Sequence, residues 1–171
     1  MMIPYVHNSR IGLIGAHTAI QHAYGLGTGM PWPRGTLEKD MRERFRPITK
    51  DAPQGKQNLL IYGKATAEAM GNRPLPGRLM MVLSRAVRSI HIRGDGVILA
   101  PTAEEGLLYT SQRPEIHDIF FIGGAVSWEA GMRYASRAYF SIVHKESTAS
   151  GLLCLEKSLP EMATAAGFVL I

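Results

Sequence analysis

Residues 119–131 read IFFIGGAVSWEAG, and this stretch decides the fold class. Ile119 to Ile122 is a continuous apolar run, which is typical of a strand covered on both faces. Two glycines follow the run, and Val126 to Tyr134 is predicted to be a short helix. A strand that turns directly into a helix is the repeating unit of an α/β sheet with right-handed crossovers.

The same unit recurs along the chain. Further apolar runs predict strands at Ile11–Ala16, Leu59–Tyr62, Leu79–Leu83, Val97–Leu99 and Ala138–Val143. Helices are predicted at Leu37–Arg46, Thr66–Met70, Ala103–Tyr109 and Glu161–Ala166. In the first of these helices, Leu37, Met41 and Phe45 form one apolar stripe at four-residue spacing, and Thr102 is the expected N-cap of the third. We therefore predict an α/β fold in one domain over residues 1–171, with a mostly parallel twisted sheet flanked by helices.

The composition fits a folded protein without cross-links. Of the 171 residues, 46% are hydrophobic and 19% are charged, which excludes a disordered chain. Cys154 is the only cysteine, and the six histidines lack the spacing of metal ligands, so we expect neither a disulfide nor a metal. No run of about 18 apolar residues could cross a membrane and no signal peptide is evident, so we expect a soluble cytoplasmic protein.

The charge balance points to small anionic ligands. The 19 lysines and arginines exceed the 14 acidic residues, which gives a net charge of +5. The cations are spread along the chain and no run of five occurs, so we do not expect a nucleic-acid-binding arm. A few specific contacts to phosphate or carboxylate groups fit this distribution better.

Three segments that follow strands have unusual chemistry. Ala23 to Pro33, AYGLGTGMPWP, alternates glycines with larger residues and holds Trp32 between two prolines. Tyr62 to Thr66, YGKAT, and Ile122 to Ala125, IGGA, each connect a strand to a helix, where free N–H groups attract anions. Taken singly, each segment is also compatible with an ordinary turn. Ligands in α/β sheets bind at the carboxyl ends of strands, so together these segments predict the site.

A fourth segment delivers an arginine. Pro74 to Arg78, PLPGR, is predicted to be a rigid turn that leads into a strand. A guanidinium fixed at that point can bind a carboxylate through two parallel hydrogen bonds. A solvated arginine would not need this scaffold.

These motifs, in this order, resemble the dihydrofolate reductase family over about residues 11–145. The resemblance rests on GLGTGMPW at 25–32, GKAT at 63–66, PLPGR at 74–78, FIGGAVSWEA at 121–130 and RAYFSIV at 137–143. It implies an enzyme that reduces 7,8-dihydrofolate to tetrahydrofolate with NADPH. It also implies a mostly parallel eight-stranded sheet whose last strand is antiparallel.

The resemblance assigns roles by position. The cofactor-binding positions that it implies are Gly25, Leu26, Met30, Gly63, Lys64, Ala65, Thr66, Ser84, Arg85, Ile122, Gly123, Gly124, Ala125, Val126 and Trp128. Among these, Lys64 and Arg85 would reach the 2′-phosphate, and a cis peptide would join the two adjacent glycines. The implied substrate-binding positions are Ile14, Ala16, Glu38, Phe45, Arg78 and Tyr139. Trp32 would hold a water near the pterin, and Ser141 would support the catalytic carboxylate.

The catalytic carboxylate is either Asp40 or Glu38. The family has an acid five or six residues after the tryptophan, which points to Glu38. The family also has a phenylalanine four residues after the acid and a threonine four further on. Phe45 and Thr49 keep the second spacing, but Asp40 lies five residues before Phe45. An insertion after Trp32 would bring Asp40 into place, and we favour Asp40.

Some positions depart from the family. Trp128 stands where a tyrosine near the nicotinamide is usual, and the usual acidic stretch is not evident in residues 150–158. The chain ends at FVLI, where the family adds another strand, and an uncovered strand edge would leave a homo-oligomer possible. Two alternatives therefore stay open. One is an inactive folate- or nucleotide-binding module, and the other is a pyrimidine reductase of riboflavin synthesis with the same fold.

Overall fold

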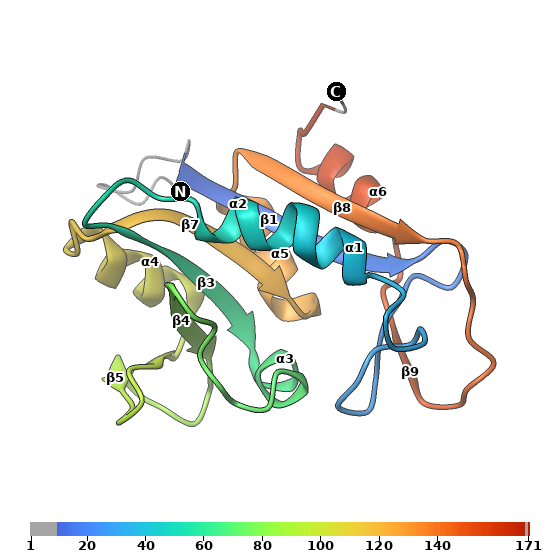
Figure 1. The fold of residues 1–171 in the computed structure, drawn as a ribbon, viewed down its shortest axis with the longest axis horizontal. Helices are drawn as coiled ribbons and strands as arrows, with labels where there is room; N and C mark the ends of the chain where they lie inside the picture. Colours follow the sequence, from blue (N-terminus) through green and yellow to red (C-terminus); the bar gives the residue numbers. More distant parts are fainter. Residues whose placement is uncertain (1–9, 170) are drawn as a thin grey trace.

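The computed structural model describes residues 10–169 and 171, which form an α/β fold built on a seven-stranded sheet (Figure 1). The strand order is β5-β6-β4-β3-β7-β1-β8. The strands are β1 Ile11–Thr18, β3 Gln57–Gly63, β4 Arg78–Leu83, β5 His91–Ile92, β6 Ile98–Ala100, β7 Ile116–Gly123 and β8 Arg137–Val143. All neighbours are parallel except β5 and β6. The predicted mostly parallel sheet and its six predicted strands are confirmed.

The resemblance implied eight strands with a last antiparallel one, but the end of the chain at FVLI had already left that last strand in doubt, and the described residues form seven strands in this sheet. Within the described residues β8 pairs only with β1, and the antiparallel pair lies at the opposite edge, between β5 and β6. The short strand β5 consists of two exposed residues, so no apolar run in the sequence predicted it.

Helices cover both faces of the sheet. On one face lie α4 (Ala103–Ser111), α5 (Ala125–Tyr134) and α6 (Leu159–Ala165), and on the other lie α3 (Lys64–Ala69) and the helical segment 38–50. Adjacent residues of β7 serve opposite faces, because Phe121 packs in the first cluster and Phe120 in the second. Burial on both sides explains the continuous apolar runs of the strands. No helix among the described residues is long and apolar enough to cross a membrane.

The segment 38–50 contains a π-helical turn. It consists of α1 (Glu38–Asp40), the π-helix η2 (Met41–Phe45) and α2 (Arg46–Lys50), and the backbone N–H of Arg46 donates to the carbonyl of Met41. A π turn holds one residue more than the helical spacing that we assumed. The predicted stripe is therefore wrong at Met41, which is 47% exposed, whereas Phe45 packs against the sheet.

The glycine-rich segment begins as a strand and not as a loop. β2 (Ala23–Leu26) pairs antiparallel with β9 (Leu152–Cys154), and we call this pair the β2–β9 ribbon. Leu26 and Gly29 then close a tight turn with two backbone hydrogen bonds, and Gly27 in that turn has a φ of 58°. The partner strand lies more than a hundred residues away, so local sequence could not predict the pairing.

Candidate active site

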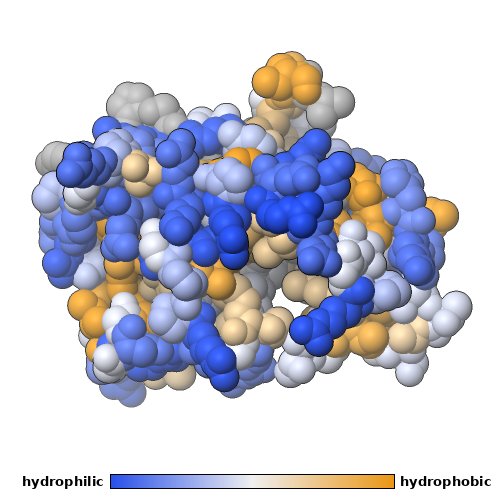
Figure 2. Space-filling model, in the orientation of Figure 1, coloured by the Kyte–Doolittle hydropathy of each residue, from blue (hydrophilic) through white to orange (hydrophobic). Residues whose placement is uncertain are grey.

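A cleft of about 800 Å³ lies between α3 and the β2–β9 ribbon. Figure 2 shows the surface hollowed at this place, below the hydrophilic side chains of segment 38–50. The cleft is lined by the predicted positions Gly25, Met30, Gly63, Lys64, Ala65, Thr66, Ser84, Arg85, Gly124, Ala125 and Val126. The predicted positions Leu26, Ile122, Gly123 and Trp128 lie outside that lining.

Two glycine turns meet at the base of the cleft. A Cβ on Gly63 would lie 3.8 Å from the backbone nitrogen of Gly124, and a Cβ on Gly124 would lie 3.3 Å from Tyr24. The peptide between Gly123 and Gly124 is cis, as the resemblance implied. Glycine leaves the backbone bare where α5 begins, and no side-chain cap covers the first turn of that helix. This cradle suits a diphosphate.

The cations of the cleft are exposed. Lys64, the first residue of α3, has a side chain that is 81% exposed and lies 3.8 Å from Glu68. Arg85 is also exposed, just beyond the end of β4. Both can approach a phosphate at the mouth of the cleft, and neither is held there by a hydrogen bond from a described residue.

Trp128 connects the cleft to strand β1, which lies between β7 and β8. Its ring is 4% exposed and meets the Tyr24 ring edge-on, with 5.4 Å between the centroids. The indole Nε1 donates to the carbonyl of Ile14 over 2.8 Å. The indole N–H therefore occupies a backbone acceptor of β1.

Asp40 lies against the sheet next to this strand. The Ser141 hydroxyl on β8 donates to Asp40 Oδ2 over 2.9 Å, and Ser141 is the register partner of Ala16 on β1. Ile14 and Ala16 are two residues apart, so both face the same side as Ser141. Glu38 is exposed, at the start of α1. Of the two candidate carboxylates, the structure thus brings only Asp40 to Ser141.

The π turn accounts for the irregular spacing of this segment. Asp40 immediately precedes η2 and Phe45 ends it, so the additional residue between them is absorbed by the wider turn. Phe45 then packs with Ile14 and Ile48 against the sheet. Asp40 and Phe45 therefore both face the sheet, although five residues separate them instead of four.

Arg78 is buried and held from two sides. It is 9% exposed, its Nη1 donates to Thr49 Oγ1 over 2.9 Å, and its Nε donates to the Pro76 carbonyl over 3.2 Å. Burial lowers the pKa of the Arg78 guanidinium, and the positive charge of Arg46 lowers it further. The buried Asn58, which donates to the carbonyls of Thr49 and Asp51, fixes the end of α2 to β3. The guanidinium keeps free donors for a carboxylate.

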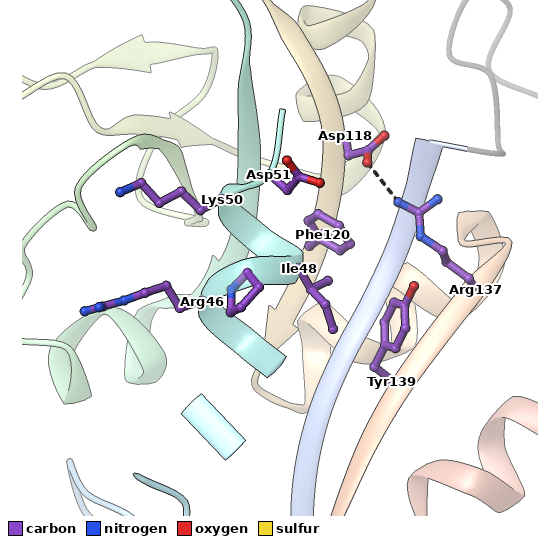
Figure 3. Close-up of a pocket in the computed structure, with 9 residues that line it drawn as sticks. Arg46, Ile48, Lys50, Asp51, Asp118, Phe120, Arg137 and Tyr139 are labelled. Carbon is purple, nitrogen blue, oxygen red and sulfur yellow. Dashed lines mark hydrogen bonds and ion pairs between the residues drawn. The ribbon is translucent and has the colours of Figure 1, made fainter. Parts of the chain in front are cut away.

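Tyr139 lies in a second hollow. This hollow, also of about 800 Å³, is bounded by α2, β7 and β8, and Tyr139 lines it together with Ile48 and Phe120 (Figure 3). Asp118 accepts a hydrogen bond from Arg137 at its rim. Tyr139 is not among the residues that line the cleft between α3 and the β2–β9 ribbon. Trp32 is half-buried and lines neither hollow.

Sequence reasoning missed several residues of the cleft. Tyr24, Thr102, Glu104, Arg133 and Leu153 line it as well. Thr102 was predicted only as a helix cap, which is confirmed because its hydroxyl accepts from the Glu105 backbone N–H. Leu153 lies on β9, and its place depends on the long-range ribbon, for which the sequence carries no signal.

The sequence profile of the dihydrofolate reductase family matches residues 10–154, which include both turns, Asp40 and Arg78. The chain belongs to the dihydrofolate reductase family. This membership confirms the resemblance found in the motifs.

Individual family members are moderately similar. A putative dihydrofolate reductase of Human herpesvirus 8 type P (isolate GK18) is 34% identical over 114 residues, which cover 62% of this chain and 51% of that protein. The dihydrofolate reductase of Drosophila melanogaster is 26% identical over 118 residues (67% and 63%). That of Candida albicans is 33% identical over 111 residues (63% and 54%). The chain thus spans between half and two thirds of the length of these curated relatives.

Proposed function

We propose that the protein reduces 7,8-dihydrofolate to 5,6,7,8-tetrahydrofolate with NADPH, and so serves one-carbon metabolism. The observation that carries the proposal is the pairing of Asp40 with Ser141 on the sheet face, on the same helical segment as Thr49, which holds Arg78. One segment therefore presents a carboxylate for the ring and orients a guanidinium for the glutamate of one ligand. A pterin linked to a glutamate carries both complementary groups.

Asp40 is the proposed catalytic residue. Its carboxylate accepts hydrogen bonds from the 2-amino group and N3 of the pterin, which fixes the ring and makes N5 more basic. Ser141 positions the carboxylate through its hydroxyl. N5 takes its proton from water, which Trp32 is proposed to hold. Charge-assisted hydrogen bonds of this kind are stronger than neutral ones, so they orient the ring well.

The cleft between α3 and the β2–β9 ribbon is the proposed NADPH site, and we call it the cofactor-side cleft. When bound, NADPH supplies the hydride that C6 of the pterin accepts. The bare backbone at Gly63 and Gly124 receives the diphosphate, and α5 adds the positive end of its dipole. Lys64 and Arg85 are proposed to bind the 2′-phosphate. Tyr24 and Met30 border the end of the cleft that belongs to the glycine-rich segment.

The test is the loss of NADPH absorbance in the presence of dihydrofolate. We expect turnover that depends on both compounds and is blocked by methotrexate. Tight methotrexate binding without turnover would instead support an inactive binding module. Absence of binding by either ligand would contradict the proposal. The PLPGR arginine argues against the pyrimidine reductase alternative, because its carboxylate-binding role has no use there.

A further inference from the structure

The cofactor-side cleft runs across the carboxyl ends of four neighbouring strands. Its lining includes Gly124 after β7, Gly63 at the end of β3, Ser84 after β4 and Thr102 after β6. These strands are adjacent in the sheet, in the order β6-β4-β3-β7. Neighbouring strands lie about 4.8 Å apart, so roughly 10–14 Å separate the cradle at Gly63 and Gly124 from the β6 end of the cleft. The cleft therefore extends well beyond the diphosphate cradle.

A carboxylate lies at the β6 end of the cleft. Glu104, in the first turn of α4, lines the cleft, and its side chain is 40% exposed. The Tyr134 hydroxyl donates to Glu104 Oε1 over 2.7 Å, and Arg133 Nη2 lies 3.6 Å from the same oxygen. The hydrogen bond from Tyr134 lowers the pKa of Glu104, although burial opposes the shift, so the side chain is ionised at neutral pH. The carboxylate is thus held in place and can still accept hydrogen bonds from a ligand.

Helix α5 gives a second measure of the distance between the carboxylate and the cradle. The helix begins at Ala125, next to Gly124, and ends at Tyr134, which contacts Glu104. The nine steps from residue 125 to residue 134 amount to about 14 Å along an α-helix. This length agrees with the spacing of the strands. It is comparable to the span from the diphosphate to the far edge of the base in an extended dinucleotide.

Apolar side chains border the same end of the cleft. Leu83 at the end of β4, Pro101 after β6, Ala103 on α4 and Ala130 on α5 all line it. Small apolar walls of this kind accept a flat ring, and a few polar groups at the rim fix the orientation of the ring. This end of the cleft is therefore suited to the base of the dinucleotide.

The charge of Glu104 needs a reason in a cleft for an anionic cofactor. The phosphates of the proposed cofactor would be repelled by a carboxylate. The adenine of the cofactor, however, carries an exocyclic amino group, and an N–H of this group is a suitable donor for a carboxylate oxygen. Hypoxanthine has a carbonyl oxygen in place of that amino group, and two acceptors that face each other repel. A carboxylate at this place can thus distinguish the two bases.

We propose that Glu104 accepts a hydrogen bond from the 6-amino group of the adenine and makes the protein selective for an adenine dinucleotide over its hypoxanthine analogue. Tyr134 is the positioning residue, because its hydroxyl holds the carboxylate. This inference rests on the proposed function. It adds the residue that recognises the base of the cofactor.

The experiment compares NADPH with the reduced form of nicotinamide hypoxanthine dinucleotide phosphate at saturating dihydrofolate. In the unaltered protein, kcat/KM should be about three- to tenfold higher for NADPH, as expected from one hydrogen bond to a partly exposed carboxylate. The advantage should fall to one or below in Glu104→Gln, because the amide oxygen can accept from Tyr134 while the amide NH₂ faces the base. The matched control is Glu105→Gln, which alters an exposed carboxylate on the same helix outside the cleft lining and should keep the advantage.

Tyr134→Phe tests the positioning role. The substitution keeps the buried ring and removes only the hydroxyl that holds Glu104. We expect the advantage of NADPH to decrease, with KM for dihydrofolate unchanged. An equal loss of kcat/KM for both cofactors, with the ratio preserved, would show that Tyr134 serves only the packing of α5 and would overturn its assignment.

The outcomes separate the inference from the proposed function. If dihydrofolate is reduced but the two cofactors have equal kcat/KM, or if the advantage survives in Glu104→Gln, the inference alone fails. If dihydrofolate is not reduced, binding of the two dinucleotides is measured by quenching of tryptophan fluorescence. Tighter binding of NADPH that is lost in Glu104→Gln would support the inference and contradict the proposed reaction. Absence of binding by both dinucleotides would overturn the inference and the proposed function together.

Discussion

The proposed substrate side and the proposed cofactor side of the site are built differently. On the substrate side, Asp40 and Arg78 are already held by hydrogen bonds from or to Ser141 and Thr49. On the cofactor side, the cradle is backbone at two glycine turns, and Lys64 is 81% exposed. The substrate side therefore depends on single fixed side chains, whereas the cofactor side spreads its contacts over backbone groups that substitution cannot remove. We therefore expect single substitutions to reduce activity more on the substrate side than on the cofactor side.

The largest effect is expected for Asp40→Asn. Asparagine keeps the shape of the side chain and can still accept a hydrogen bond from Ser141, but it removes the negative charge that we propose orients the pterin. We expect kcat at neutral pH to fall by about a hundredfold or more, with NADPH affinity almost unchanged. Steady-state kinetics and a cofactor titration measure both. The control is Glu38→Gln, an exposed carboxylate two residues earlier. A loss in the control with none in Asp40→Asn would reverse our assignment.

A smaller loss, confined to substrate binding, is expected for Arg78→Lys. Lysine retains the charge but cannot present the planar fork, so it loses the paired hydrogen bonds to a carboxylate. We expect KM for dihydrofolate to rise about ten- to a hundredfold, with a smaller change in kcat. Arg113→Lys, at an exposed arginine after α4, controls for the chemistry of the exchange. An unchanged KM would show that the glutamate binds elsewhere.

On the cofactor side, Lys64→Ala should narrow the preference for NADPH over NADH. Because the side chain is exposed, we expect the ratio of kcat/KM values to fall only about two- to fivefold. Lys39→Ala is a matched control, since Lys39 is also 81% exposed and lies near a glutamate four residues later. If the ratio is unchanged in Lys64→Ala, the 2′-phosphate contact belongs to Arg85 or another residue. A fall in this ratio as large as the rise in KM expected for Arg78→Lys would contradict the view that single side chains matter less on the cofactor side.

The parallel core could be predicted from sequence because each buried strand is a local apolar run. Leu59 to Tyr62 and Ile119 to Ile122 are examples, and both lie at the centre of the sheet. β2 and β9 could not be predicted, because each is short and is stabilised by a partner far along the chain. The predicted burial of Met41 was wrong for a different reason, because we applied an α-helical spacing across a π turn.

The candidate site was predictable where a motif fixes the backbone. The turns at Gly63 and Gly124 line one cleft, as their place after strands predicts. The choice between Asp40 and Glu38 stayed open in the sequence, because counting residues cannot detect an insertion absorbed by a helix. The position of Tyr139 also depends on the hollow between α2 and β8, which local sequence does not encode.

The smallest effect concerns His17, which supports β1 from the face opposite Ile14 and Ala16. The buried imidazole accepts from the Leu159 backbone N–H through Nε2 over 3.0 Å, and its Nδ1 lies 2.7 Å from the Thr18 carbonyl. This pattern requires the neutral ring. Burial lowers the pKa of His17 below 6.5, although the Thr18 carbonyl opposes the shift. The unfolded chain therefore binds more protons below pH 6.5, and the free energy of unfolding should fall as the pH is lowered from neutrality.

His17→Gln isolates this contribution, because the amide oxygen can still accept from Leu159 but does not titrate. Chemical denaturation between pH 7 and pH 5 should show a shallower loss of stability in the variant than in the unaltered protein. The neighbouring charged groups remain in both proteins, so the difference between the two slopes reports mainly on residue 17. Equal slopes would mean that protonation of His17 does not contribute to the loss of stability at low pH. If kcat at neutral pH were also unchanged in the variant, the hydrogen bonds of His17 on one face of β1 would not be required for the activity proposed on the opposite face, where Ile14 and Ala16 lie.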